Sequence, residues 1–143
     1  MGLLIVDAEV SAGEQGARHR VSFLVDTGAI YSLLPEAVWR ELGLEPARTM
    51  EFTLADTTRI RRQVSECRFN ILGVGATSPV ILGEGDDQPL LGAVTLESLG
   101  LVWNPFERSL RPARMMLAAQ LPRSAMICGR STVVRIPGGA AQT

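Results

Sequence analysis

One stretch decides the fold of this sequence: Val21-Ser22-Phe23-Leu24-Val25-Asp26-Thr27-Gly28-Ala29. Its first five residues are apolar or β-branched except for Ser22, a pattern that predicts a buried strand. The run then places the carboxylate of Asp26 at the end of this strand. An ionised carboxylate buried there would be costly without hydrogen-bond donors or a retained proton. Thr27 offers a hydroxyl, and Gly28 lets the backbone turn sharply. The stretch is therefore either a catalytic carboxylate or only a turn that ends a strand.

The segments on either side predict short strands and two short helices. Residues 3–10 form a first strand, and a polar loop over 11–17 leads back into the strand 21–25. After the turn, residues 29–34 are extended, and Pro35 and Gly43 bracket a helix over 36–42. A hairpin is expected from arms at 49–54 and 59–64, with 55–58 at its tip. Further strands are expected at 67–72, 78–82, 101–103 and 109–111, with a turn at 73–75 and a second helix over 93–99.

The two helical segments belong to a faint internal repeat. Residues 36–44 match residues 92–101 with an offset of one residue, and each segment follows an apolar strand and ends in Leu-Gly-Leu. Two such halves predict a pseudo-symmetric, mainly β domain with one short helix in each half. Only the first half carries an aspartate at the end of its strand. In the second half the matching place is Leu90-Leu91-Gly92.

Composition indicates an ordinary globular chain. Its 143 residues are 46% hydrophobic and 20% charged, which suits one domain with a modest core. The longest apolar runs have only a few residues, against the roughly 20 that span a bilayer, so we expect no membrane partner. The start has no basic segment typical of a signal peptide, which favours a cytoplasmic location. Cys67 and Cys128 are expected to be free thiols in a reducing compartment.

Charge and residue types exclude several classes of function. Up to Glu107 the chain has 15 acids and 8 arginines, a net charge of −7, whereas the rest has 6 arginines and no acid. Such a basic tail more often docks on its own domain than on nucleic acid, and no interleaved aromatic residues favour nucleic-acid binding. His19 is the only histidine, and the two cysteines lack metal-type spacing. We therefore expect no metal, no cofactor and no nucleic-acid partner.

An ordered set of motifs resembles the retropepsin-like (clan AA) aspartic proteases, in particular the small single-domain bacterial and retroelement-derived kind. The motifs are Asp26-Thr27-Gly28-Ala29, Tyr31-Ser32-Leu33-Leu34-Pro35, Leu54-Ala55-Asp56, Leu90-Leu91-Gly92 before a helix ending Leu99-Gly100-Leu101, and Trp103-Asn104-Pro105. The resemblance covers residues 1–112 and leaves 113–143 as a basic C-terminal extension. It implies the acid-protease fold, a closed β-barrel of pseudo-twofold halves with one or two short helices.

The resemblance also implies a role for each matched segment. Asp26 would be the catalytic carboxylate, and Thr27, Gly28 and Ala29 the turn that supports it. Leu91 and Gly92 would form the site loop of the second half. The flap over an extended polypeptide substrate would include the four residues Leu54, Ala55, Asp56 and Thr57. Because peptide hydrolysis by carboxylates requires two of them, Asp26 of a second copy must supply the other, which predicts a homodimer.

Three interpretations remain open at this stage. The chain is an aspartic endopeptidase, a non-catalytic dimerisation or peptide-binding module, or a protease that processes only itself near Leu121-Pro122-Arg123. The flap tip lacks the glycine that is common in the family, which bears on its mobility. Asp56, Asp86 and Asp87 are better interpreted as solvated turn and loop residues, and Trp39 and Trp103 as core residues. Within the extension, residues 115–121 have helical character and 132–136 strand character.

Overall fold

A computed structural model describes residues 3–114 of the chain. The described residues up to Ala113 form one compact unit. The basic extension, with its expected helical turn at 115–121 and strand at 132–136, lies outside the described residues.

The described part contains nine strands and two short helices. In chain order they are β1 (Ile5–Ser11), β2 (Arg18–Val25), β3 (Ser32–Leu34), α1 (Glu36–Glu41), β4 (Arg48–Thr53), β5 (Arg59–Ile71), β6 (Val74–Leu82), β7 (Leu90–Leu91), α2 (Ala93–Ser98), β8 (Leu101–Asn104) and β9 (Ser109–Pro112).

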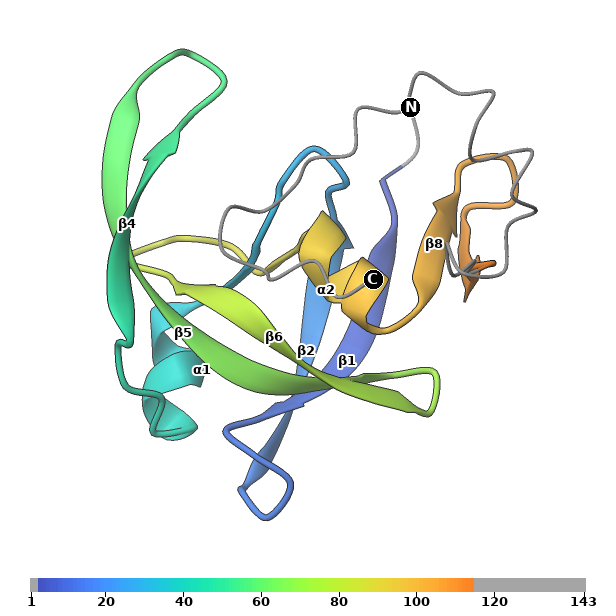
Figure 1. Ribbon diagram of the computed structural model, residues 1–143, viewed down its shortest axis with the longest axis horizontal. Helices are drawn as coiled ribbons and strands as arrows, with labels where there is room; N and C mark the ends of the chain where they lie inside the picture. Colours follow the sequence, from blue (N-terminus) through green and yellow to red (C-terminus); the bar gives the residue numbers. More distant parts are fainter. Residues whose placement is uncertain (1–2, 115–143) are drawn as a thin grey trace, which may run out of the picture. The chain divides into compact units, whose positions relative to one another are not determined.

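Six of these strands form a closed barrel. The sheet runs in the order β1-β2-β7-β3-β6-β5-β4, and a further antiparallel pairing of β1 with β5, which brings Glu9 opposite Asn70, closes it. Only β4 is left outside the closure, so that β4 and the first half of β5 project from the barrel as a hairpin (Figure 1). The second sheet is the β8–β9 hairpin. The mainly β, closed-barrel fold expected from the sequence is confirmed.

The barrel consists of two equivalent halves that exchange strands. β2 pairs in parallel with β7, β3 pairs in parallel with β6, and Leu33 faces Leu90 where β3 and β7 meet. A shift of 57 residue numbers relates the halves, because Val25 pairs with Leu91 and Leu34 with Leu82 (25 to 82, 34 to 91). The same shift relates α1 (Glu36–Glu41) to α2 (Ala93–Ser98). Two pseudo-symmetric halves with one helix each are therefore present, as expected.

The correspondence between the halves differs from the one expected. The N–H of Asp26 donates to the carbonyl of Leu91 over 3.0 Å, and the N–H of Gly83 donates to the carbonyl of Leu34 over 2.8 Å. These two bonds are equivalents, so the partner position of Asp26 is Gly83. The motif Leu90-Leu91-Gly92 corresponds instead to Leu33-Leu34-Pro35, and the offset of one residue in the helical repeat was wrong. The sequence match was misaligned because the apolar residues before both helices are alike.

The core draws on all six barrel strands. The rings of Phe23 and Phe69 meet at its centre with 5.7 Å between centroids. The largest fully buried apolar side chains are Phe23, Phe69, Leu34, Ile71, Leu82, Leu91, Val10, Val64 and Val80. Trp39 of α1 packs against this cluster, as expected, and its indole N–H donates to the carbonyl of Gly83 over 2.9 Å. Trp103 is only partly buried and is not among the side chains that pack on the core, which corrects the expectation for that residue.

β5 is one strand of 13 residues where the sequence predicted two. The alternation of exposed and buried residues changes phase at Val64 and Ser65, both of which are buried. The strand leaves the projecting hairpin there and enters the barrel, and the Ser65 hydroxyl donates to the carbonyl of Glu45 over 2.7 Å. The turn expected at 73–75 is a tighter one, with Leu72 and Gly73 at φ of 52° and 78° between β5 and β6.

Candidate active site

Asp26 is the first residue after β2, and backbone hydrogen bonds fix the turn that it begins. Its N–H is held by Leu91, and its own carbonyl accepts the N–H of Ala29 over 3.1 Å. The Asp26 carboxylate accepts the N–H of Gly28 over 3.0 Å. A Cβ on Gly28 would lie 3.2 Å from the same carboxylate oxygen, so glycine gives the carboxylate room. We call residues 26–29 the Asp26 turn.

The Asp26 turn lies at the surface of the single chain. Asp26, Thr27 and Gly28 are exposed, and Ala29 is half-buried. The carboxylate therefore keeps its contact with water in one copy, and the desolvation anticipated for the end of a buried strand is absent. Because the Thr27 side chain is also exposed, its hydroxyl is free to contact a second molecule.

Leu91 and Gly92 lie behind the turn and are buried. A Cβ on Gly92 would lie 2.6 to 2.8 Å from backbone atoms of Tyr31 and Ile30, so only glycine allows this approach. The N–H groups of Ala93 and Val94 donate to the carbonyls of Ala29 and Ile30 over 2.9 and 3.0 Å. The start of α2 thus holds the segment 29–31. Leu91 and Gly92 support the site from behind and contribute no exposed surface to it.

A buried hydroxyl cluster completes this support and was not foreseen from the sequence. Thr95 of α2 shares hydrogen bonds with Ser32 of β3 (2.6 Å) and with Ser78 of β6 (2.9 Å). Ser32 also accepts the N–H of Gly92 over 2.9 Å. Thr95 and Ser32 are fully buried, and Ser78 is 1% exposed. The sequence signal for this cluster was one polar residue within each of three apolar segments. Such a residue is usually hydrogen-bonded when it is buried.

The second half offers no equivalent carboxylate. A Cβ on Gly83, the partner position of Asp26, would lie 2.5 Å from the carbonyl oxygen of Leu34 and 3.2 Å from the Cβ of Asp87. The acids of the loop that follows have other contacts. Asp87 accepts the N–H of Glu84 over 2.9 Å, and Arg62 lies 3.4 and 3.5 Å from the carboxylates of Glu84 and Asp87. Among residues 3–114, the second half therefore has no carboxylate at the position that corresponds to Asp26.

The hairpin expected as a flap is formed by β4 and the start of β5. At its tip the N–H of Leu54 donates to Thr58 over 2.8 Å, and the N–H of Thr57 donates to Leu54 over 2.9 Å. Asp56 accepts the N–H of Thr58 over 3.0 Å, and hydrogen bonds from the Thr58 side chain and backbone hold the pKa of Asp56 below its usual 3.8. Leu54, Ala55, Asp56 and Thr57 are all exposed. Thr57 has φ of 69°, a conformation that suits glycine and is strained for a β-branched residue.

The hairpin touches the segment after the Asp26 turn through Tyr31, a contact that the sequence did not suggest. The Tyr31 ring lies edge-on to Phe52 of β4, with centroids 6.3 Å apart and an interplanar angle of 76°. Arg48 donates to the Tyr31 hydroxyl over 3.3 Å. The hairpin therefore contacts the segment that follows the Asp26 turn, through residues outside the predicted flap tip.

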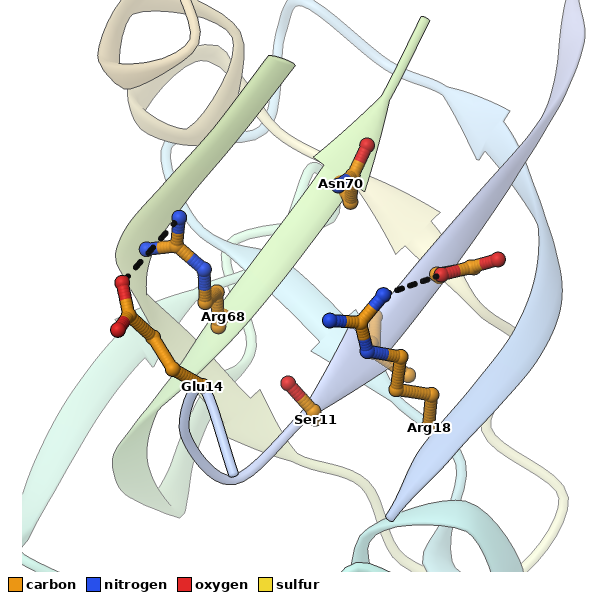
Figure 2. Close-up of a pocket in the computed structure, with 7 residues that line it drawn as sticks. Ser11, Glu14, Arg18, Arg68 and Asn70 are labelled. Atoms are coloured by element: carbon orange, nitrogen blue, oxygen red, sulfur yellow. Dashed lines mark ion pairs between the residues drawn. The ribbon is translucent and has the colours of Figure 1, made fainter. Parts of the chain in front are cut away.

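One small hollow on the surface lies elsewhere, where β1 pairs with β5. It encloses only about 20 Å³, and the arginines that line it are already paired, Arg18 with Glu9 at 3.6 Å and Arg68 with Glu14 at 3.8 Å (Figure 2). A cavity of this size holds about one water molecule. It offers neither the space nor the free charge of a substrate site.

Among residues 3–114, no group of three or more histidine, cysteine or acidic side chains is placed to hold a metal ion. Neither helix there is long and apolar enough to cross a membrane.

A closed barrel of two pseudo-symmetric halves, an Asp-Thr-Gly turn at the end of an apolar strand and a projecting hairpin define the acid-protease fold. The model of one family, described as "gag-polyprotein putative aspartyl protease", matches residues 15–98, and the chain belongs to this family. The chain is similar to the solution structure of simian foamy virus (mac) protease at 19% identity and a TM-score of 0.48, over 65% of this chain and 91% of that one. Comparison with curated proteins gave no significant match.

Proposed function

We propose that the protein is an aspartic endopeptidase whose active unit, residues 1–112, works as a homodimer with one Asp26 from each copy at its centre. The observation that carries this proposal is that Asp26 and Gly83 occupy equivalent positions in the two halves of the barrel. The first half presents an exposed carboxylate on a hydrogen-bonded turn, and the second half has no room for a side chain at that place. Membership of an aspartyl protease family supports the chemistry.

The chemistry of the pair follows from the repulsion of like charges. Two carboxylates a few Å apart do not both ionise readily, so the pair loses its two protons in separate steps and holds one proton between them. The ionised Asp26 takes a proton from a water molecule, which attacks the peptide carbonyl. The protonated Asp26 donates its proton to the carbonyl oxygen and stabilises the tetrahedral intermediate. Collapse of this intermediate with protonation of the amine breaks the peptide bond.

The remaining residues of the site position the pair and the substrate. Thr27 contacts the second copy and keeps the two turns in register. The Gly28 N–H holds the Asp26 carboxylate, and the Ala29 N–H holds the turn through the Asp26 backbone carbonyl. An extended peptide lies between the turns and the flap hairpin, whose free β4 edge offers main-chain hydrogen bonds to it. Closure of the hairpin excludes water other than the nucleophile.

The second candidate is a peptide-binding or dimerisation module with little turnover. The flap tip favours it, because Thr57 holds a strained conformation without glycine and Asp56 ties the tip through Thr58. A stiff flap would bind peptide and open slowly.

Cleavage of an unfolded protein at acidic and neutral pH separates the two candidates. The parent should produce defined fragments, a pepstatin-type inhibitor should suppress them, and Asp26→Asn should lower the rate by at least about 10³-fold. The matched control is Asp86→Asn, which changes an exposed acid of the second-half loop and should leave the rate unchanged. Equal cleavage by Asp26→Asn and the parent would contradict the enzyme, while peptide binding without cleavage would favour the module.

A further inference from the structure

Arg48 and Phe52 connect the flap hairpin with the segment that follows the Asp26 turn. Both side chains come from β4, and both contact Tyr31, five residues after Asp26 in the sequence. The backbone of Tyr31 is fixed in turn by its close packing on Gly92. The Tyr31 side chain is thus an anchored point beside the proposed site, with a phenol ring against Phe52 and a hydroxyl oxygen against Arg48.

The face of the hairpin on which Arg48 lies is the one turned toward this segment. Successive residues of a strand point to opposite faces, so Arg48, Met50 and Phe52 share one face of β4. Their partners across the hairpin are Val64, Arg62 and Ile60, which share the same face. The opposite face carries Glu51, opposite which lies Arg61 on β5. A peptide held under the flap hairpin would meet the face of Arg48 and not the face of Arg61.

Within the part of the chain that the structure describes, Arg48 differs from the other arginine on that face in having no acidic partner. Arg62 contacts Glu84 and Asp87 and is mostly buried. The Arg48 guanidinium is exposed, and among residues 3–114 no carboxylate lies within ion-pair distance of it. A guanidinium has five N–H donors, and the single bond to Tyr31 leaves most of them available for another acceptor. Its orientation is nevertheless restricted, because the Tyr31 hydroxyl accepts one of them.

We propose that Arg48, oriented by Tyr31, binds an acidic side chain of the extended polypeptide substrate and so gives the site a preference for Asp or Glu at one position. The inference rests on the proposed function in so far as the peptide lies under the flap hairpin. The aromatic pair Tyr31 and Phe52 forms an apolar wall for the methylene groups of that side chain. Each of the two Arg48 side chains of the proposed homodimer affects one position, because neighbouring side chains of an extended peptide point away from the guanidinium.

The expected preference for an acidic side chain is local, and it runs against the electrostatic effect of the chain's net negative charge. Up to Glu107 the net charge is −7, which repels acidic peptides in general. A gain for one glutamate at one position therefore requires a nearby cation. Since Arg48 is exposed, we expect a modest effect that weakens as salt is added.

Binding to the non-cleaving Asp26→Asn chain tests the inference without requiring turnover. The probes are fluorescent eight-residue apolar peptides in which one Glu, or its neutral counterpart Gln, is moved through each position. At the position that faces Arg48 of either copy we expect Glu to bind about three- to fivefold more tightly than Gln at low salt. Arg48→Met should remove this ratio and Arg48→Lys should retain part of it. The matched control Arg61→Met, on the opposite face of the same hairpin, should leave it unchanged.

Three results would overturn the inference. They are a Glu/Gln ratio near one at every position, a ratio that persists in Arg48→Met, and a ratio lost equally in Arg61→Met. A weaker dimer in Arg48→Met with an unchanged ratio would assign the guanidinium to a contact between copies, and so counts against a substrate role. Cleavage by the parent protein is measured in a separate experiment. A protein that does not cleave can therefore be distinguished from one that has no preference for Glu.

Discussion

At the scale of single residues, Thr95 is the side chain on which the support of the site depends most. Its hydroxyl lies between Ser32 and Ser78, and all three are buried. Thr95→Val keeps the shape and leaves two buried hydroxyls short of a partner, which should lower the free energy of unfolding by about 1–3 kcal/mol. Urea denaturation measures the change. Thr77→Val, at an exposed position of β6, is the control and should stay within about 0.5 kcal/mol of the parent. Equal effects of the two substitutions would contradict the role of the cluster.

Cys67 illustrates the opposite case, a chemically reactive residue type made inert by its position. Its side chain is buried in β5, and burial raises the pKa of its thiol to about 12. Because the thiolate is the reactive form, native Cys67 should be almost unreactive at neutral pH. In a Cys128→Ser background, the rate of labelling by a thiol reagent should rise by at least about 100-fold when urea unfolds the chain. Rapid labelling of the folded protein would show that the β5 core opens readily.

At the scale of elements, the flap hairpin combines a strained residue with an acid-sensitive turn. Thr57 has φ of 69°, which costs a non-glycine residue about 1–2 kcal/mol. Thr57→Gly removes this strain but adds freedom to the unfolded chain, so we expect a net stabilisation of about 0.5–1 kcal/mol in urea unfolding. The neighbouring Thr58→Gly, at a residue without positive φ, should instead destabilise the protein. Destabilisation by Thr57→Gly of the same size as by Thr58→Gly would contradict the strain.

The same tip should loosen in acid. Hydrogen bonds from Thr58 lower the pKa of Asp56 from 3.8 in the folded chain. A lowered pKa means that the interaction is fully present above 3.8 and is lost as the pH falls through the folded value. Amide exchange of Thr58 should therefore speed up, after correction for intrinsic rates, between about pH 5 and about pH 2. Asp56→Ala should exchange rapidly at every pH, and a parent profile without this transition would exclude the carboxylate as the acceptor.

The elements were largely predictable from the sequence, and their pairing was not. Pro35 before α1 and Gly43 after it are local start and stop signals of a helix, and α1 accordingly lies within the expected range. The closure of β1 on β5 joins residues about sixty positions apart, and no local pattern encodes it. The same holds for Gly83, whose equivalence to Asp26 appears only in the hydrogen bonds to Leu34 and Leu91. For the site, the Asp26 turn was evident as a motif, whereas the contacts of Tyr31 with β4 depend on tertiary structure.

At the scale of the whole molecule, the absence of space at Gly83 determines how the dyad can be completed. A carboxylate introduced by Gly83→Asp would place its Cβ 2.5 Å from the Leu34 carbonyl oxygen, at a position tied to α1 through Trp39. We expect Gly83→Asp to be destabilised by several kcal/mol, on the order of 3, and to have no activity as a monomer. Unfolding and size-exclusion chromatography measure both properties. An active, stable monomer would show that one chain can hold the pair, against the proposed dimer.

Mixing experiments extend this argument to the assembled protein. If each active centre contains Asp26 from both copies, a dimer of one parent and one Asp26→Asn chain has a single carboxylate and does not cleave. After exchange of subunits in an equal mixture, about one quarter of the dimers should contain two parent chains and be active. If each chain worked alone, about half of the parent activity would remain. Asp86→Asn, mixed in the same way, should cause no such loss, because its carboxylate is an exposed loop acid outside the proposed centre. Activity proportional to the parent fraction in the Asp26→Asn mixture would mean that each chain works alone, and the shared dyad would have to be abandoned.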